Sequence, residues 1–474
     1  MAPTAAAAAS AVRGISQEAF EALVRENMED LGMDPDEALD DALQTLTLQG
    51  VDLSGIVKCI PGVTSVKDNP VIQTIDRLKS IITSLVSSES SDSPDEKVDE
   101  IVELLDKLCE LCSAEGSDGA SIVTRNGGVE LLTKLCSSLD VKSERALVST
   151  LKSLNSIIRD VQSTETFRQC GGPKIVMDIL HRSREYPNLL DSGFAVVAAA
   201  SSGNEVVKES LMDLKVDELI LEILREPSKN ELRSLYDAIR VLLTPDDSRV
   251  AASQVYGYAR RFAKIGIPDV LVNALRKGVS SSSLPSACAA LKAIAVNDEI
   301  CLSISENGGI EVTLQFIDKS GEQNSKVVAR ACCSLLSKLA GSDANKTAIV
   351  QQDGLNRLIK LSSRFSEDPS VIQEVMNVIT VLSLRLPENA ARAIEAGAGD
   401  LAVQAMQKFP ASNQMQRQAC LMIRNLVVRN PENRTILLNN GIEKLIRKAK
   451  GTHQSCKDAA TAALRDLGLD DYNA

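Results

Sequence analysis

The chain has 474 residues, of which 44% are apolar and 24% are charged, so it can bury a hydrophobic core. Its only histidines are His181 and His453, which argues against His-centred catalysis and His-rich metal sites. It has no run of about 18 apolar residues, which excludes a membrane-spanning helix. The net charge of −12 disfavours nucleic acid and anionic membranes as partners.

The acidity belongs to the N-terminal quarter, because residues 1–120 carry 24 acidic and eight basic side chains. The Ala-rich residues 1–14 lack the charged and Leu-rich regions of a secretory signal, and we expect a disordered tail there. The eleven cysteines then indicate reduced thiols in a cytoplasmic or nuclear protein. Cys109 and Cys112 form a lone CxxC on a predicted helix, which favours two core thiols over a metal or redox site.

Residues 15–67 predict an acidic helical arm. Ser16 is the expected N-cap of its first helix, and Asp34 with Pro35 begins the second. Residues 68–114 contain two amphipathic segments on either side of a Ser- and acid-rich stretch, 87–96, which we interpret as an exposed loop. This region predicts a degenerate first repeat or cap, because a stack of repeats needs a polar end to stay soluble.

A repeated pattern dominates residues 115–470, and 471–474 form a short tail. Each copy has a short apolar helix, a turn that usually contains glycine, and an amphipathic helix. We place the turns at Gly128, Gly172, Lys215, Gly266, Gly309, Gly354, Gly399 and Gly441. Their spacing is 42–45 residues except for one gap of 51, between Lys215 and Gly266. At these positions glycine is expected to end the first helix in a left-handed conformation.

A third apolar helix rich in Ala, Cys and Ser follows each copy, as in ACLMIRNLV at 419–427. Small side chains let neighbouring helices approach closely, so the copies must stack to bury their apolar faces. These helices and turns resemble armadillo repeats. The last two repeats, together with ISQEAFEALVRENMEDLGMDPDEAL and QGVDLSGIVK near the N-terminus, resemble the armadillo repeat-containing protein 6 family. The resemblance implies an all-α, right-handed superhelical solenoid of about eight repeats with a helical N-terminal cap.

The chain departs from one subgroup of that superfamily. Importin-like members use a Trp and an Asn, one turn apart on the third helix, to grip an extended peptide. The corresponding positions here include Ala289 with Ala293, and Ser334 with Lys338; only Asn425, paired with Leu421, matches. We interpret Asn425 either as a surface amide or as a remnant peptide clamp.

Two segments are candidate partner-binding sites. The first is a basic C-terminal groove, formed by Arg417, Leu421, Arg424, Asn425 and Arg429. Arginine suits carboxylate partners, so this groove could receive an acidic segment of a partner or the acidic arm of the chain itself. The alternative is a solvated basic face.

The second candidate is the insert that expands the repeat to 51 residues. It contains Arg249, Tyr256, Tyr258, Arg260 and Arg261, and Tyr and Arg are enriched at binding hot spots. Insertions in a regular array often lie on the binding face. Alternatively, the insert is an elongated first helix whose aromatic side chains pack on the neighbouring repeat.

No motif for catalysis, metal or phosphate binding is present in the sequence. The sequence therefore predicts a non-enzymatic protein-interaction scaffold or adaptor, without cofactors, that binds acidic or extended protein segments in a groove. We expect a monomer in the cytoplasm, with the nucleus as an alternative, and no nucleic-acid or membrane partner. The alternative function is a transport carrier of the nuclear-import type, which the missing Trp/Asn ladder disfavours.

Overall fold

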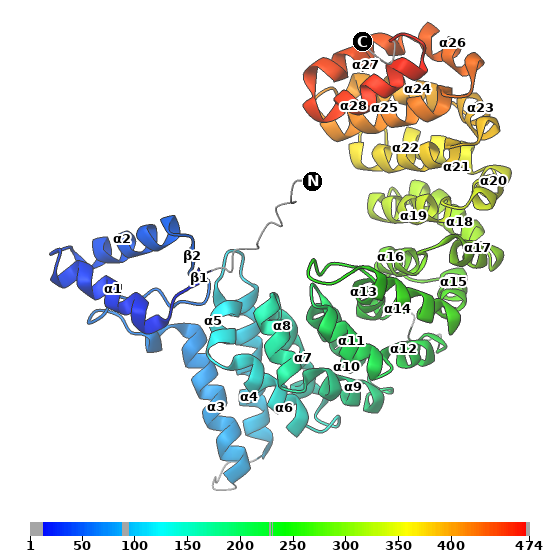
Figure 1. Ribbon diagram of the computed structural model, residues 1–474. Helices are drawn as coiled ribbons and strands as arrows, with labels where there is room; N and C mark the ends of the chain where they lie inside the picture. Colours follow the sequence, from blue (N-terminus) through cyan, green and yellow to red (C-terminus); the bar gives the residue numbers. More distant parts are fainter. Residues whose placement is uncertain (1–12, 88–93, 227–228, 230, 471–474) are drawn as a thin grey trace, which may run out of the picture. The chain divides into compact units, whose positions relative to one another are not determined.

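The computed structural model describes residues 13–87, 94–226, 229 and 231–470, and these residues form two compact units (Figure 1). Unit 1 lies within residues 1–216 and 246–250, and unit 2 within 217–245 and 251–474. Most of the predicted tail 1–14, most of the loop 87–96 and the tail 471–474 lie outside the described residues. Arg13–Gly14 differ from the predicted disorder, because this segment (β1) pairs in parallel with β2 (Val51–Asp52).

The N-terminal arm is a pair of helices, α1 (Gln17–Glu29) and α2 (Pro35–Leu48). The predicted starts are confirmed: the Ser16 side chain accepts a hydrogen bond from the Ala19 amide, and Asp34 caps α2. A small core between the helices includes Phe20, Val24 and Leu46.

Polar contacts brace this arm internally and join it to the first repeat. The Gln17 amide brackets Val57, donating to its carbonyl and accepting from its N–H, both at 2.9 Å. Arg125 Nη1 donates to the Ile15 carbonyl at 2.8 Å, and Lys58 pairs with Asp118 at 2.9 Å. The arm is therefore attached at both of its ends.

The solenoid begins with a short η1 (Val66–Asp68) and the long helices α3 (Pro70–Ser87) and α4 (Pro94–Ser113). Eight repeats of three helices follow. The first helices are α5 (Gly119–Arg125), α8 (Val161–Gln169), α11 (Glu205–Asp213), α14 (Ser253–Lys264), α17 (Asp298–Glu306), α20 (Asp343–Gln351), α23 (Pro387–Glu395) and α26 (Pro431–Asn439). The second helices are α6 (Gly128–Ser138), α9 (Gly172–Arg182), α12 (Val216–Leu224), α15 (Ile267–Lys277), α18 (Gly309–Glu322), α21 (Gly354–Arg364), α24 (Ala398–Lys408) and α27 (Ile442–Thr452). The third helices are α7 (Glu144–Ile157), α10 (Pro187–Ser201), α13 (Arg233–Leu242), α16 (Leu284–Ile294), α19 (Lys326–Leu339), α22 (Pro369–Ser383), α25 (Asn413–Val427) and α28 (Lys457–Asp466), the last preceded by η3 (Gln454–Cys456).

The third helices form a row within each unit (Figure 1). In unit 1, α4 packs on α7 and α7 on α10; in unit 2 the row runs from α13 through α16, α19, α22 and α25 to α28. This arrangement confirms the predicted all-α armadillo solenoid of eight repeats. No helix among the described residues is long and apolar enough to cross a membrane.

The left-handed turn between the first and second helix is displaced by one or two residues from its predicted position in five repeats. The residues with positive φ are Gly127, Gly171, Lys215, Gly266, Gly308, Asp353, Gly397 and Gly441. Predictions at Lys215, Gly266 and Gly441 are correct, whereas those at Gly128, Gly172, Gly309, Gly354 and Gly399 are wrong. The spacing of the pattern could not separate adjacent glycines, and at 353 the left-handed residue is an aspartate.

The adjacent glycines have a different role. Gly172 begins α9, and a Cβ there would lie 2.3 Å from the buried Phe167 ring. A Cβ on Gly128 would lie 2.1 Å from Val123. These glycines let the second helix start against the first, so GG supplies one residue for the turn and one for close packing.

Buried asparagines join successive repeats at a spacing of 44 residues, at Asn345, Asn389 and Asn433. Asn389 donates to the Leu382 carbonyl at 3.1 Å and Asn433 to the Leu426 carbonyl at 2.8 Å. Each thereby satisfies a carbonyl near the C-terminus of the preceding third helix. Sequence analysis missed this periodic signal.

We predict that Gly171→Ala and Gly172→Ala destabilise the chain for different reasons. Gly171 has open space around it and a φ of 75°, so alanine there costs about 1 kcal/mol of backbone strain. Gly172→Ala costs about 2–3 kcal/mol because Phe167 must move. Gly257→Ala, inside α14 with nothing within 4 Å, is the control and stabilises by about 0.5–1 kcal/mol. Urea unfolding followed by circular dichroism checks the order, and a larger cost at Gly171 would contradict it.

Candidate functional site

A hollow of about 420 Å³ lies on the face that α13, α16 and α19 present. Small side chains on α16 and α19 line it, including Ala289, Ala293, Ala331 and Ser334. Larger apolar side chains line it as well: Leu243, Pro245, Tyr256, Pro285 and Val296. Two of the pairs of positions that carry Trp and Asn in importin-like repeats, Ala289 with Ala293 and Ser334 with Lys338, therefore border this space.

Three cationic side chains line the same hollow, namely Arg240 on α13, Lys292 on α16 and Lys338 on α19. No Asp or Glu is among its described lining residues. Lys292 Nζ donates to Ser334 Oγ at 2.7 Å, and in the described part of the chain no carboxylate lies within 4.0 Å of either lysine amine. Arg240 lies 4.0 Å from Asp237.

Glu374 on α22 is an acidic group close enough for its charge to interact with that of Lys292. Burial raises the pKa of Glu374, although Lys292 and Arg330 act in the opposite direction. The hollow thus combines apolar walls with an excess of positive charge, which suits an anionic ligand that also carries an apolar group.

The structure separates the predicted insert residues. Tyr256 lies on α14, is 42% exposed and lines the hollow. Arg260 is exposed, and the Tyr258 hydroxyl accepts a hydrogen bond from Gln254 on its own helix. Arg261 forms a bidentate ion pair with the fully buried Asp217 of α12. Its Nη2 lies 2.8 Å from Asp217 Oδ1 and its Nε lies 2.6 Å from Asp217 Oδ2. This pair fastens α14 in place, so Tyr256 projects from a fixed helix.

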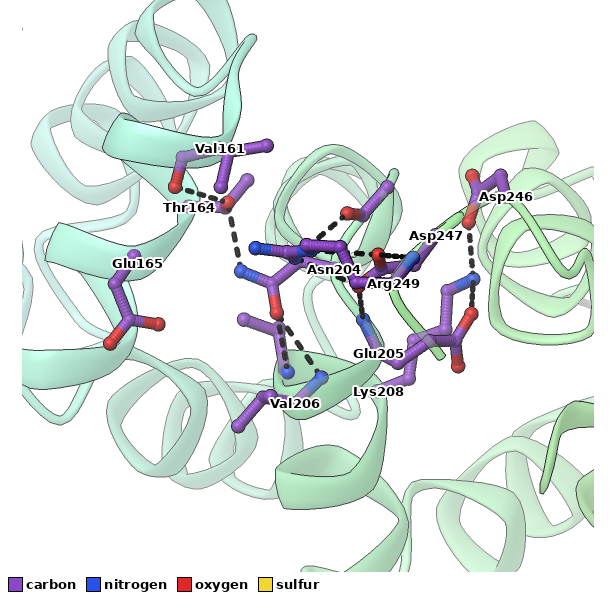
Figure 2. Close-up of polar contacts among 12 residues, drawn as sticks. Val161, Thr164, Glu165, Asn204, Glu205, Val206, Lys208, Asp246, Asp247 and Arg249 are labelled. Atoms are coloured by element: carbon purple, nitrogen blue, oxygen red, sulfur yellow. Dashed lines mark hydrogen bonds and ion pairs between the residues drawn. The ribbon is translucent and has the colours of Figure 1, made fainter. Parts of the chain in front are cut away.

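Arg249 belongs to a different site. It lies in Asp246–Val250, a segment that packs within unit 1 and that we call the anchored segment (Figure 2). Arg249 donates from Nε and Nη2 to the two oxygens of Asp247, both at 2.8 Å. Asp247 also accepts the backbone N–H of Glu205, at the N-terminus of α11. The insert is consequently divided between two surfaces.

A buried lysine completes this network. Lys208 on α11 is fully buried, and its Nζ lies 2.8 Å from Glu205 Oε1 and 2.5 Å from Asp246 Oδ1. Asn204 caps α11 and donates to Thr164 of the preceding repeat at 3.0 Å (Figure 2). Glu205 Oε1 pairs with Lys208, whereas Glu205 Oε2 is buried without a hydrogen-bond partner. The ion pairs of Lys208 and Arg249 hold the anchored segment against α11.

In the predicted C-terminal groove, two of the three arginines form ion pairs with acidic residues of the last repeat. Arg417 lies 2.9 Å from Asp458, and Arg424 lies 3.3 Å from Asp466 on α28. The Asn425 amide donates to the Thr380 carbonyl of α22 at 2.9 Å, while Leu421 is half-buried. Of the five predicted residues, Arg429 is exposed beyond the end of α25. Partner binding at these positions stays a prediction.

Sequence reasoning missed Arg240, Lys292 and the carboxylates of α28. The first two are single cations in separate repeats, and only the row of third helices brings them together. Asp458 and Asp466 follow Arg417 and Arg424 by 41 and 42 residues, close to one repeat length, and that periodic charge pairing was a readable signal.

The cysteines are free thiols, and nine of the eleven are buried; Cys109 and Cys170 are half-buried. Burial raises the pKa of Cys112, Cys136 and Cys420 to about 12. A contact with Cys288 and burial raise the pKa of Cys332 well above its usual value. These thiols stay protonated and are poor nucleophiles. The described residues contain no group of three or more His, Cys, Asp or Glu that could hold a metal ion.

We predict that Lys208→Met lowers the free energy of unfolding by about 3–5 kcal/mol, because it leaves the buried Glu205 carboxylate uncompensated. Lys346→Met is the matched control: Lys346 is also buried, but its partner Asp343 is 65% exposed and regains water, so the cost is smaller. Adding Glu205→Gln to Lys208→Met should recover part of the loss. Equal costs for the two lysines in urea unfolding would contradict the account.

We also predict an acid-sensitive contribution from Asp247. The Arg249 side chain, aided by the N–H groups of Arg249 and Glu205, holds the pKa of Asp247 well below its usual value near 3.8. Because the folded pKa is lowered, the stabilisation is present above about pH 4 and is lost as the pH falls toward the folded pKa. Asp247→Asn should flatten the fall in urea midpoint between about pH 5 and pH 2. The exposed Asp213→Asn is the control, and an identical effect there would contradict this assignment.

The sequence matches two family models and several known proteins. A family model described as ARMC6 matches residues 72–471, and one described as the armadillo repeat-containing protein 6 N-terminal domain matches residues 12–97. Armadillo repeat-containing protein 6 of Homo sapiens is 28% identical over 406 residues, covering 82% of this chain and 77% of that protein. The Drosophila melanogaster homologue is 27% identical over 390 residues, covering 81% and 80%.

Solved structures show the same fold. An engineered protein aligns with a TM-score of 0.61 at 18% identity, covering 86% of this chain and 97% of that chain. A structure from work on the interaction between cadherin and beta-catenin aligns with a TM-score of 0.53 at 15% identity, covering 84% and 79%. With family models matching both the arm and the repeats, the chain belongs to the armadillo repeat-containing protein 6 family.

Proposed function

We propose that this chain is a non-enzymatic interaction scaffold that binds an acidic, extended segment of a partner protein along the third-helix face of unit 2. The observation that carries the proposal is the hollow between α13, α16 and α19. Three cations line it beside apolar side chains, and no carboxylate is among its described lining residues. Opposite charge steers such a partner to the face, and apolar contact then slows its dissociation.

The row of third helices supports an extended ligand rather than a compact one. Each helix packs on the next from α13 to α28, so the face repeats with every layer and can be followed by a chain segment. The interaction between cadherin and beta-catenin, named for the structural neighbour above, is a protein–protein interaction on a related fold. The likeness is one of fold, and it supports the proposal that the ligand of this chain is a protein.

The proposed location is the cytoplasm, and the proposed state is a monomer. A carrier that captures basic segments is the competing function. The positive lining of the hollow disfavours it, because a basic segment would meet Arg240, Lys292 and Lys338.

We predict that Lys292→Glu combined with Lys338→Glu weakens binding of the labelled peptide Ser-Glu-Asp-Glu-Phe-Glu-Asp-Glu-Ser at least tenfold, because two attractive charges become repulsive. Fluorescence anisotropy on the full chain measures the affinity. Wild-type binding should also fall as NaCl rises from about 50 mM to about 300 mM. The same peptide with Lys in place of each acidic residue should bind at least tenfold more weakly than the acidic peptide.

Lys360→Glu on the second helix α21 is the matched control, because it makes the same type of charge change away from the hollow. It should leave the affinity within about twofold of wild type. Tighter binding of the basic peptide would revive the carrier function. Unchanged binding of the acidic peptide by the double variant would exclude the hollow as its site.

A further inference from the structure

We infer that the hollow between α13, α14, α16 and α19 is an anchor pocket for one bulky apolar side chain, aromatic or branched, of the acidic partner segment. The inference rests on the proposed function and adds the feature that selects the ligand. An acidic segment with such a side chain should bind far more tightly than an equally acidic segment without one.

The space exists because of the side chains that α16 and α19 carry. Ala289 and Ala293 are half-buried and border the hollow, as do Ala331 and Ser334. None of these side chains extends far enough to fill a volume of about 420 Å³. An apolar side chain that enters this space leaves water for a largely apolar surface, which is the interaction that most strongly separates large residues from small ones.

Tyr256 supplies an aromatic edge to the pocket. Tyr256 is 42% exposed, whereas Val255, Ala259 and Phe262 of the same helix are buried. The ion pair between Arg261 and Asp217 fastens that helix to α12. A tyrosine on an anchored helix has only two side-chain torsions to immobilise when a ligand packs against it, so Tyr256 is suited to a contact role.

The charges around the hollow identify the segment as acidic. Ser334 positions the Lys292 amine at 2.7 Å, and Arg240 and Lys338 come from the helices on either side of α16. Carboxylates before and after the apolar residue of the ligand can therefore meet cations from three successive repeats. A basic segment would instead meet repulsion from these cations, and a neutral one would gain no electrostatic attraction.

The test uses the full chain and labelled peptides Ser-Glu-Asp-Glu-Xaa-Glu-Asp-Glu-Ser, in which Xaa is Ala, Leu, Phe or Trp. We expect the best of the large residues to bind about ten- to a hundredfold more tightly than Ala, as burial of one such side chain implies. Tyr256→Ala should reduce this advantage severalfold and leave the Ala peptide unaffected.

Ala293→Leu fills the hollow without changing charge. It should abolish most of the advantage of the large residue while retaining the affinity for the Ala peptide. Ala391→Leu is the matched control, because Ala391 is also half-buried on a helix but lies on α23, outside the hollow. Thermal unfolding of each variant, followed by circular dichroism, verifies that it is folded.

The outcomes separate the two proposals. If all four peptides bind equally and remain sensitive to Lys292→Glu with Lys338→Glu, the anchor pocket is wrong and the scaffold proposal stands. If no acidic peptide binds, both fail for this face. If Ala293→Leu instead changes the sedimentation of the chain alone, the occupant is a second copy of the chain and the peptide assignment is overturned.

Discussion

Close packing of the third helices is the constraint on which the rest of the structure depends. Each of these helices packs against the third helices of the neighbouring repeats within its unit, and small side chains at several contacts allow a close approach. Ala290, Cys332 and Ala419 are completely buried for this reason. Ala289 and Ala293 lie on the face of α16 that borders the hollow, and their small side chains leave that space unfilled. The rule that builds the stack therefore also creates its candidate binding site.

The expanded repeat shows how one insertion serves two purposes. Its first part, the anchored segment, satisfies the N-terminus of α11 through Asp247 and the buried Lys208 through Asp246. Its second part is helix α14, which Arg261 fastens to Asp217 and which presents Tyr256 beside the hollow. Deleting the insert as a whole would remove a helix with a buried face, so single substitutions are the informative changes.

Much of the fold could be predicted from the sequence, because the repeat length, the turn and the amphipathic helices are local patterns. The left-handed residue at Asp353 was not predicted, since the neighbouring Gly354 fits the same pattern and its role in packing against Ile349 is visible only in three dimensions. Within the candidate sites, Tyr256 was named in advance, whereas Arg240 and Lys292 were not. The cations Arg417 and Arg424 were identified, but their partners on α28 were not, because ion pairs between repeats depend on which helix faces lie together.

The most direct measurement is photo-cross-linking of the full chain to the acidic peptide with photo-leucine at its apolar position, followed by mass spectrometry of the cross-linked residues. The account predicts that the cross-links concentrate on residues that line the hollow, such as Tyr256, Ala293 and Val296. It also predicts that an uncharged peptide with the same photo-leucine gives few of them. Cross-links that concentrate on second helices, or that scatter equally for both peptides, would contradict the claim that this face recognises an acidic segment through an apolar anchor.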